Sequence, residues 1–152
     1  GMQVFSVLSK PVDLNVLLYA VNSDSPHHRS ATRWVENTIG GAETVAIPWV
    51  VILGFLRLST SRHVFAKPLA PEQAVEIVDE WLARPNVIPL GAGRDHWRVL
   101  KSLIAGAGTA GNLTTDAHLA ALAIEHGCHL CSTDADFGRF PQLDWINPLT
   151  SR

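Results

Sequence analysis

Short apolar runs alternate along this chain with longer stretches in which apolar residues recur at helical spacing. The short runs are typical of buried strands, and the longer stretches are typical of helices that pack against them. Because strands separated by helices are usually parallel, this alternation predicts an α/β fold with a central, mostly parallel sheet. Ligands of such sheets bind beyond the carboxyl ends of the strands. The residues that follow each predicted strand are therefore the first candidates for a functional site.

The predicted elements cover most of the chain. Strands are expected to end at 12–13 and to occupy 43–47, 87–90, 128–132 and 143–146. Helices are expected to begin at 15, at 25–26, at 48 and at 71, and to span 94–105 and 114–126. Ser25 is the expected cap of the second helix, with Pro26 in its first turn. A polar loop at 59–68, a glycine-rich connector at 106–112 and a tight turn after Asp134 join these elements.

The composition is that of an ordinary folded protein. The 152 residues, 47% of them apolar and 17% charged, fit one domain over residues 2–152, with Gly1 interpreted as a remnant of tag removal. No apolar run reaches the roughly 18 residues of a membrane span, and no secretory signal is recognised, so the expected location is cytoplasmic. The net charge of −2 excludes a strongly basic protein that wraps nucleic acid. Any contact with nucleic acid must come from a local patch or through a metal.

Four aspartates lie in apolar surroundings beside the predicted ends of elements: Asp13, Asp116, Asp134 and Asp136. An isolated ionised carboxylate is costly to bury, and carboxylates gathered in one cleft repel each other. A divalent cation removes both problems, so the four acids predict a site for a hard cation such as Mg²⁺ or Mn²⁺. Such a site supports metal-assisted hydrolysis of a phosphate ester.

Each aspartate also has a structural alternative when it is taken alone. Asp116, together with Thr114 or Thr115, could cap a helix. Asp134 and Asp136 could shape a turn through hydrogen bonds to the local backbone. Only the convergence of the acids on one sheet edge would separate these roles from metal binding.

Four segments carry a resemblance to a known family. They are Val-Asp-Leu-Asn-Val-Leu-Leu-Tyr-Ala at 12–20, Gly-Asn-Leu-Thr-Thr-Asp-Ala-His-Leu-Ala-Ala-Leu-Ala at 111–123, Ser-Thr-Asp-Ala-Asp-Phe-Gly-Arg-Phe at 132–140 and Trp-Ile-Asn-Pro-Leu at 145–149. Together and in this order they resemble PIN-domain proteins, and more narrowly the VapC-type toxins of bacterial toxin–antitoxin pairs. The resemblance implies a three-layer α/β/α sandwich and an endoribonuclease that depends on Mg²⁺ or Mn²⁺. It also implies an RNA substrate, a cognate antitoxin protein as partner, and a homodimer.

The resemblance assigns roles to individual residues. Asp13, Asp116 and Asp134 match the acidic cluster that holds the metal, and Asp136 matches a frequent further acid that supports the water or the metal. Asn15 matches the polar residue two positions after the first aspartate, which orients Asp13 or holds a metal-bound water. One position departs from the pattern, because Gly54 stands where many PIN proteins have a glutamate.

Two alternatives to an active toxin ribonuclease stay open. Because Gly54 has no side chain to offer a metal, the chain could be a catalytically weak or inactive PIN module that binds RNA or an antitoxin. A phosphatase with an aspartate nucleophile is the weaker alternative, since such enzymes usually carry a second acid two residues after the first, where this chain has Asn15.

Two basic clusters and two tryptophans have no assigned role at this point. The first cluster could contact phosphates or an antitoxin, or be solvated surface, and the second is expected to be surface. Tryptophans pack in the core more often than they stack on bases, so the exposure of the two near helix starts is informative. The first cluster is Arg57, Arg62, His63 and Lys67, the second is Arg94, His96 and Arg98, and the tryptophans are Trp49 and Trp97.

Overall fold

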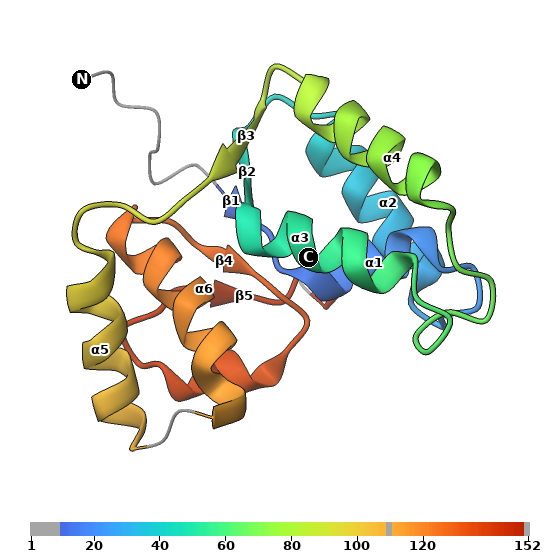
Figure 1. Ribbon diagram of the computed structural model, residues 1–152. Coiled ribbons are helices and arrows are strands. Elements are labelled where there is room, and N and C mark those ends of the chain that lie inside the picture. The colour runs from blue at the N-terminus through green and yellow to red at the C-terminus, as the bar shows by residue number, and fades with distance from the viewer. Residues whose placement is uncertain (1–9, 109–110, 151–152) are drawn as a thin grey trace.

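The computed structural model describes residues 10–108 and 111–150 (Figure 1). The strands of this part of the chain are β1 (Lys10–Pro11), β2 (Val45–Pro48), β3 (Val87–Leu90), β4 (Leu130–Cys131) and β5 (Trp145–Ile146). β1 pairs with β2, β2 with β3 and β4 with β5, and each pair is parallel. A parallel bridge between Val12 and Cys131 joins β1 to β4, so the strand order is β3-β2-β1-β4-β5.

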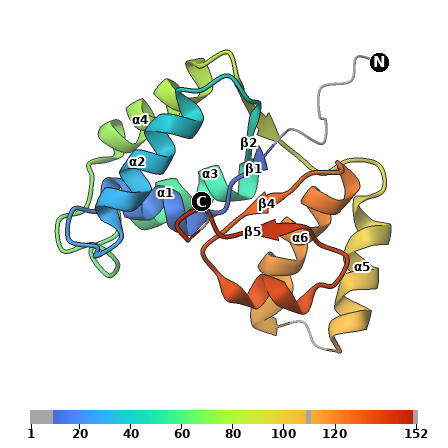
Figure 2. The same cartoon turned by 180° about the vertical axis from the view of Figure 1, so that it is seen from behind.

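Helices cover both faces of these strands. They are α1 (Leu14–Val21), α2 (His28–Ile39), α3 (Trp49–Ser59), α4 (Pro71–Ala83), α5 (His96–Ala107) and α6 (Thr114–Glu125), with short 3-10 helices η1 (Gly111–Leu113) and η2 (Ala135–Arg139). Figures 1 and 2 show α1 to α4 grouped on one side of the strands and α5 and α6 on the other. This arrangement confirms the predicted α/β/α fold with a parallel sheet. No helix within the described ranges is long and apolar enough to cross a membrane.

The strands and α6 form the centre of the core. All four residues of β2 are buried, as expected for a parallel strand that is covered on both faces. In α6 six residues are buried, namely Ala117, Leu119, Ala120, Ala121, Leu122 and Ala123. A helix that is apolar nearly all round belongs inside the protein. Packing around α6 therefore also fixes the position of Asp116 in its first turn.

The strand order contains a topological switch point. The chain adds β2 and β3 on one side of β1, and then returns through α5 and α6 to place β4 on the other side of β1. Crevices at such points, beyond the carboxyl ends of the strands, are where ligands bind in α/β sheets. Asp13 follows β1 and Asp134 follows β4, so both aspartates lie at this crevice.

Several boundaries differ from the predicted ones. α2 begins at His28 instead of 25–26, because Ser25 Oγ accepts the His27 N–H (3.1 Å) and closes a turn before the helix. β4 is shorter than 128–132, because the Cys128 N–H donates to the Ala123 carbonyl (2.8 Å) and ends α6. β5 is shorter than 143–146, and the predicted tight turn after Asp134 is the 3-10 helix η2. α5 continues to Ala107, two residues past its predicted end.

Candidate functional site

A pocket of about 200 Å³ lies at the switch point between α1, α3 and α6. Asp13, Asn15, Asp116 and Asp134 line it, together with Thr115. These residues come from three segments that are far apart in the sequence. The structure therefore brings four of the five predicted site residues into one pocket.

Asp13 is buried where β1 passes into α1. Its Oδ1 accepts the Leu14 N–H (2.6 Å), and its Oδ2 accepts the hydroxyl of Ser132 (2.6 Å). Burial raises the pKa of the Asp13 carboxyl, the hydrogen bonds from Ser132 and Leu14 lower it, and the nearby charge of Asp134 raises it. The two hydrogen bonds hold both carboxylate oxygens of Asp13 in place.

Ser132 belongs to the site, although its position in the sequence did not indicate this. Its side chain is fully buried, and its Oγ also accepts the N–H of Asp134 (3.0 Å). One hydroxyl thus connects Asp13 to the backbone that positions Asp134. The available signal in the sequence was a serine two residues before Asp134, at the end of a predicted apolar strand.

The carboxylates of Asp116, Asp134 and Asp136 form a close group. Each contributes an oxygen, and these oxygens all lie within 4.8 Å of one another. Burial, followed by the charges of Asp134, Asp13 and Asp136, raises the pKa of Asp116 to about 6. A cation among these groups would relieve the repulsion and favour the ionised form of each carboxylate.

Of the two structural alternatives for these aspartates, a turn at Asp134 and Asp136 and a helix cap at Asp116, the structure shows the turn. Asp134 accepts the backbone N–H of Asp136 (2.9 Å), so it does shape the turn into η2. The residue that precedes α6 is Leu113, and its side chain makes no cap hydrogen bond. Asp116 lies in the first turn of α6 and lines the pocket, where its carboxylate meets those of Asp134 and Asp136.

The donor atoms fit a hard divalent cation. The pocket and its rim offer carboxylate oxygens from four aspartates and the side-chain amide of Asn15. Oxygen ligands of this kind suit Mg²⁺ and Mn²⁺, whereas sites for softer metals are built from histidine and cysteine. The two cysteines are buried and do not line the pocket.

Comparison with known proteins agrees with this geometry. The profile of the PIN domain family matches residues 11–143. This chain belongs to the PIN domain family. It is 44% identical over 139 residues to Ribonuclease VapC37 of Mycobacterium tuberculosis, covering 91% of this chain and 96% of that relative. It is 43% identical over 137 residues to Ribonuclease VapC33 of the same species, covering 90% of this chain and 96% of that relative.

A solved structure shares the fold. It is the crystal structure of VapBC2 from Rickettsia felis bound to a DNA fragment from the VapBC2 promoter. One chain of that complex superposes on this protein with a TM-score of 0.67. The superposition covers 91% of this PIN protein and 98% of that chain, at 22% sequence identity. The family resemblance of the four sequence segments, including its narrower VapC form, is confirmed.

Gly54 lies where the sequence departs from the PIN pattern, and it is buried in α3. A Cβ built on Gly54 would lie only 2.8 Å from Leu14 Cδ2, so Leu14 fills the space that a side chain at position 54 would need. Leu14 lines the pocket, as do Val50 and Val51 of α3. The α3 side of this PIN-domain pocket is therefore apolar, and α3 contains no acidic residue.

The second basic cluster is only partly at the surface. His96 was expected there, but it is buried and turned toward α6, with Nδ1 2.9 Å from Glu125 Oε1 and Nε2 2.8 Å from His118 Nδ1. Glu125 Oε1 also accepts the Gly93 N–H (3.0 Å). The expectation for His96 was wrong, because a histidine near a helix start can satisfy both ring nitrogens against a neighbouring helix. These contacts join the start of α5 to the helix that carries Asp116.

Proposed function

We propose that this PIN-domain protein is the toxin of a toxin–antitoxin pair and cleaves RNA internally with the help of Mg²⁺ or Mn²⁺. The observation that carries the proposal is the convergence of Asp13, Asp116 and Asp134 on one pocket at the switch point of the sheet. The identity of 44% to Ribonuclease VapC37, over nearly the whole of both chains, supports the ribonuclease activity. Relatives with VapC names, and a neighbour in fold that was solved as a VapBC complex, support a cognate antitoxin as partner.

The proposed roles follow from the contacts of each side chain. Asp13, Asp116 and Asp134 would hold the cation, and Asp136 would add a fourth carboxylate. When bound, the cation would orient the phosphodiester, lower the pKa of the attacking water and offset charge on the leaving oxygen. Ser132 orients Asp13 by donating to its Oδ2, and this hydrogen bond offsets part of the rise in the Asp13 pKa that burial causes. Asn15 lines the pocket and would orient Asp13 or the water.

The dimensions of the pocket favour a flexible substrate. A pocket of about 200 Å³ has room for a phosphate group and a cation, and is too small to admit a duplex. Single-stranded or looped RNA can bend its backbone into such a site. The apolar side formed by Leu14, Val50 and Val51 would contact the ribose or base beside the cleaved bond.

Cleavage of a structured RNA in the presence of Mn²⁺ tests the proposal. Asp116→Asn is the first variant, because it removes one charge from a half-buried carboxylate without changing the size of the side chain. Its cleavage rate should fall by a factor on the order of 100 or more, as for loss of a group that holds a catalytic metal. Asp79→Asn, at an exposed position of α4, is the matched control and should cleave normally. Equal cleavage by both variants would eliminate the proposed catalyst.

The second candidate function is a PIN module that binds RNA or antitoxin with little or no catalysis. The observation that favours it is the absence of any acid on α3 and the packing of Leu14 against Gly54. A calorimetric titration with Mg²⁺ and Mn²⁺ separates the two functions. Absence of binding at millimolar metal would favour the module without catalysis.

We further propose that the protein is a cytoplasmic homodimer. Trp49 and Leu53 lie one turn apart on α3 and are 49% and 63% exposed. Large apolar side chains that share an exposed helix face are typical of protein–protein contacts. Light scattering of the purified protein should give the mass of a dimer, and Leu53→Glu should shift it toward the monomer. A monomeric mass for the unmodified protein would contradict this part of the proposal.

A further inference from the structure

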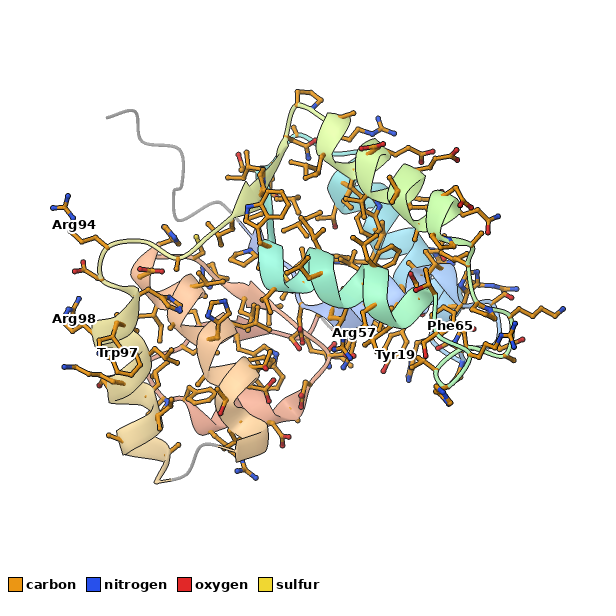
Figure 3. All side chains as sticks on the ribbon, in the orientation of Figure 1. Tyr19, Arg57, Phe65, Arg94, Trp97 and Arg98 are labelled. Atoms are coloured by element: carbon orange, nitrogen blue, oxygen red, sulfur yellow. The ribbon has the colours of Figure 1, made fainter. Side chains whose placement is uncertain are left out.

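Helix α5 has two chemically different faces. His96, Val99 and Leu103 are buried against the rest of the protein. On the opposite face, Trp97, Arg98 and Lys101 are exposed, and Lys101 follows the other two by four and three residues, which makes it their neighbour on the helix surface. Arg94 is also exposed and lies in the turn two residues before α5. These four residues form what we call the α5 stripe: Arg94, Trp97, Arg98 and Lys101. Figure 3 shows the side chains of Arg94, Trp97 and Arg98 at the outer edge of the molecule, on the side of α5 that faces solvent.

Packing of the fold does not account for the α5 stripe. Trp97 is 66% exposed, more than any other large apolar side chain in the described ranges. The Arg98 side chain is 70% exposed and lies 3.8 Å from Asp95, which is 64% exposed. An ion pair this open to water is weak, so Arg98 can turn to another anion at little cost.

The charge of the rest of the protein is unfavourable for binding a polyanion. The net charge is −2, and the pocket is lined by aspartates, so the protein as a whole does not attract a polyanion. A substrate with a phosphate backbone then needs cations outside the pocket. Arginine and lysine side chains pair with phosphates, and an aromatic side chain between them stacks on an unpaired base. The α5 stripe has this combination on one face.

The stripe also lies within reach of the pocket. α5 packs beside α6 through the contacts of His96 with His118 and Glu125, and α6 carries Asp116 in its first turn. Figures 1 and 2 show α5 on the side of α6 away from α1 and α3, the other helices that line the pocket, so about two helix diameters, roughly 20 Å, separate the stripe from the pocket. An RNA strand of several nucleotides spans that distance.

We propose that the α5 stripe binds the RNA substrate outside the cleaved bond. Arg94, Arg98 and Lys101 pair with backbone phosphates, and Trp97 stacks on an unpaired base. This inference rests on the proposed function, because it adds a second contact to the same RNA. The stripe is a positioning surface that long RNAs use, whereas an RNA of a few nucleotides occupies only the pocket.

RNA binding measured in EDTA tests the stripe separately from catalysis. The probe is a labelled single-stranded RNA of about 30 nucleotides, longer than the site of one nucleic-acid-binding domain. Arg94→Ala/Arg98→Ala is compared with Arg29→Ala/Arg33→Ala, which removes the same charge from exposed positions of α2. The α5 variant should bind at least tenfold more weakly than the α2 variant. Its plot of log affinity against log salt should flatten by about 1.4, for two lost phosphate contacts on a single strand.

Trp97 is tested in the same assay. Trp97→Ala should weaken binding by a factor of about 5 to 160, the range for loss of one stacked base, and Trp97→Tyr should retain most of the affinity. With Mn²⁺ present, the stripe variants should cleave the long RNA more slowly and an RNA of a few nucleotides at the normal rate. All the stripe substitutions are at exposed positions, so thermal melts should match those of the unmodified protein.

Three results would overturn the inference. The first is equal loss of binding in the α5 and α2 variants, which would indicate a general charge effect. The second is a dimer that dissociates when Trp97 is replaced, with RNA binding lost only in proportion to the fraction of dimer lost. This result would make the stripe a protein interface. The third is active cleavage of long RNA with no change in the stripe variants. Stripe-dependent binding by a protein that cleaves nothing would instead support the inference and reject the proposed ribonuclease.

Discussion

Ser132→Ala is the most direct test of how the protein positions its acidic pocket. The Ser132 side chain is fully buried, donates to Asp13 Oδ2 at 2.6 Å and accepts the Asp134 N–H at 3.0 Å. Alanine removes both hydrogen bonds but changes the packed volume by only one oxygen atom. Any effect on the pocket therefore comes from the lost hydrogen bonds.

The expected magnitude follows from the charge and burial of Asp13. A hydrogen bond to a charged group contributes about 1.5–3 kcal/mol, and a partly buried Asp134 N–H left without its acceptor adds to the loss. We expect the free energy of unfolding to fall by about 2–3 kcal/mol. The bond from Ser132 also lowers the pKa of Asp13, so its removal disfavours the ionised form that a cation requires. Metal affinity should drop about 10- to 100-fold, as is usual when a group that orients a metal ligand is removed.

Two measurements check these values. Calorimetric titration with Mn²⁺ near neutral pH gives the affinity, and urea unfolding gives the stability. Ser102→Ala is the matched control, because Ser102 is an exposed serine on α5. If Ser132→Ala binds Mn²⁺ with unchanged affinity and unfolds at the same urea concentration as the control, the hydroxyl does not hold Asp13 and the reasoning is refuted.

Three further expectations concern the pocket and the helices beside it. The pKa of Asp116 is raised to about 6 from 3.8, so the folded protein binds this proton more tightly than the unfolded chain does. The free energy of unfolding of the metal-free protein should therefore fall as the pH rises from about 4 to about 6. In urea melts over this pH range, Asp116→Asn should show a smaller loss of stability than the unmodified protein. Gly54→Glu should push Leu14 out of the pocket wall and destabilise the fold by about 1–3 kcal/mol in urea melts. Adding Leu14→Ala should restore part of this stability, and a double variant that is no more stable than Gly54→Glu would show that the wall is loosely packed. Glu125→Gln should weaken the contacts of Glu125 with His96 and with the backbone of residue 93, so that the residue 93 amide exchanges faster with solvent; unchanged exchange would show that the carboxylate is not needed there.

Local patterns in the sequence were sufficient for most of the fold. β3 occupies the predicted residues 87–90, and α4 begins at Pro71, because an apolar run between turn residues and a proline at a helix start act through neighbouring residues. The predicted boundary at Ser25 failed for the same kind of reason. Its hydroxyl had two possible backbone partners, and the turn before α2 took it.

The sequence predicted the chemistry of the site, but it did not predict the residues that position the carboxylates. Carboxylates in apolar surroundings indicate a cation from their charge alone, so Asp13, Asp116 and Asp134 could be selected without a structure. Ser132 could not, because its hydroxyl donates to Asp13, which is 119 residues away along the chain. The same limit applied to the packing of Leu14 on Gly54.

The sequence by itself determined how strands and helices alternate along the chain and which residues are able to hold a cation, since both depend on side-chain type and on spacing between near neighbours. The tertiary structure alone decided which side chains meet. It turned His96 inward against α6 and left Trp97 beside it in solvent, although the two residues are adjacent in the chain. The physical reason is that a helix places consecutive residues about 100° apart, so the neighbouring helix selects which of them is buried.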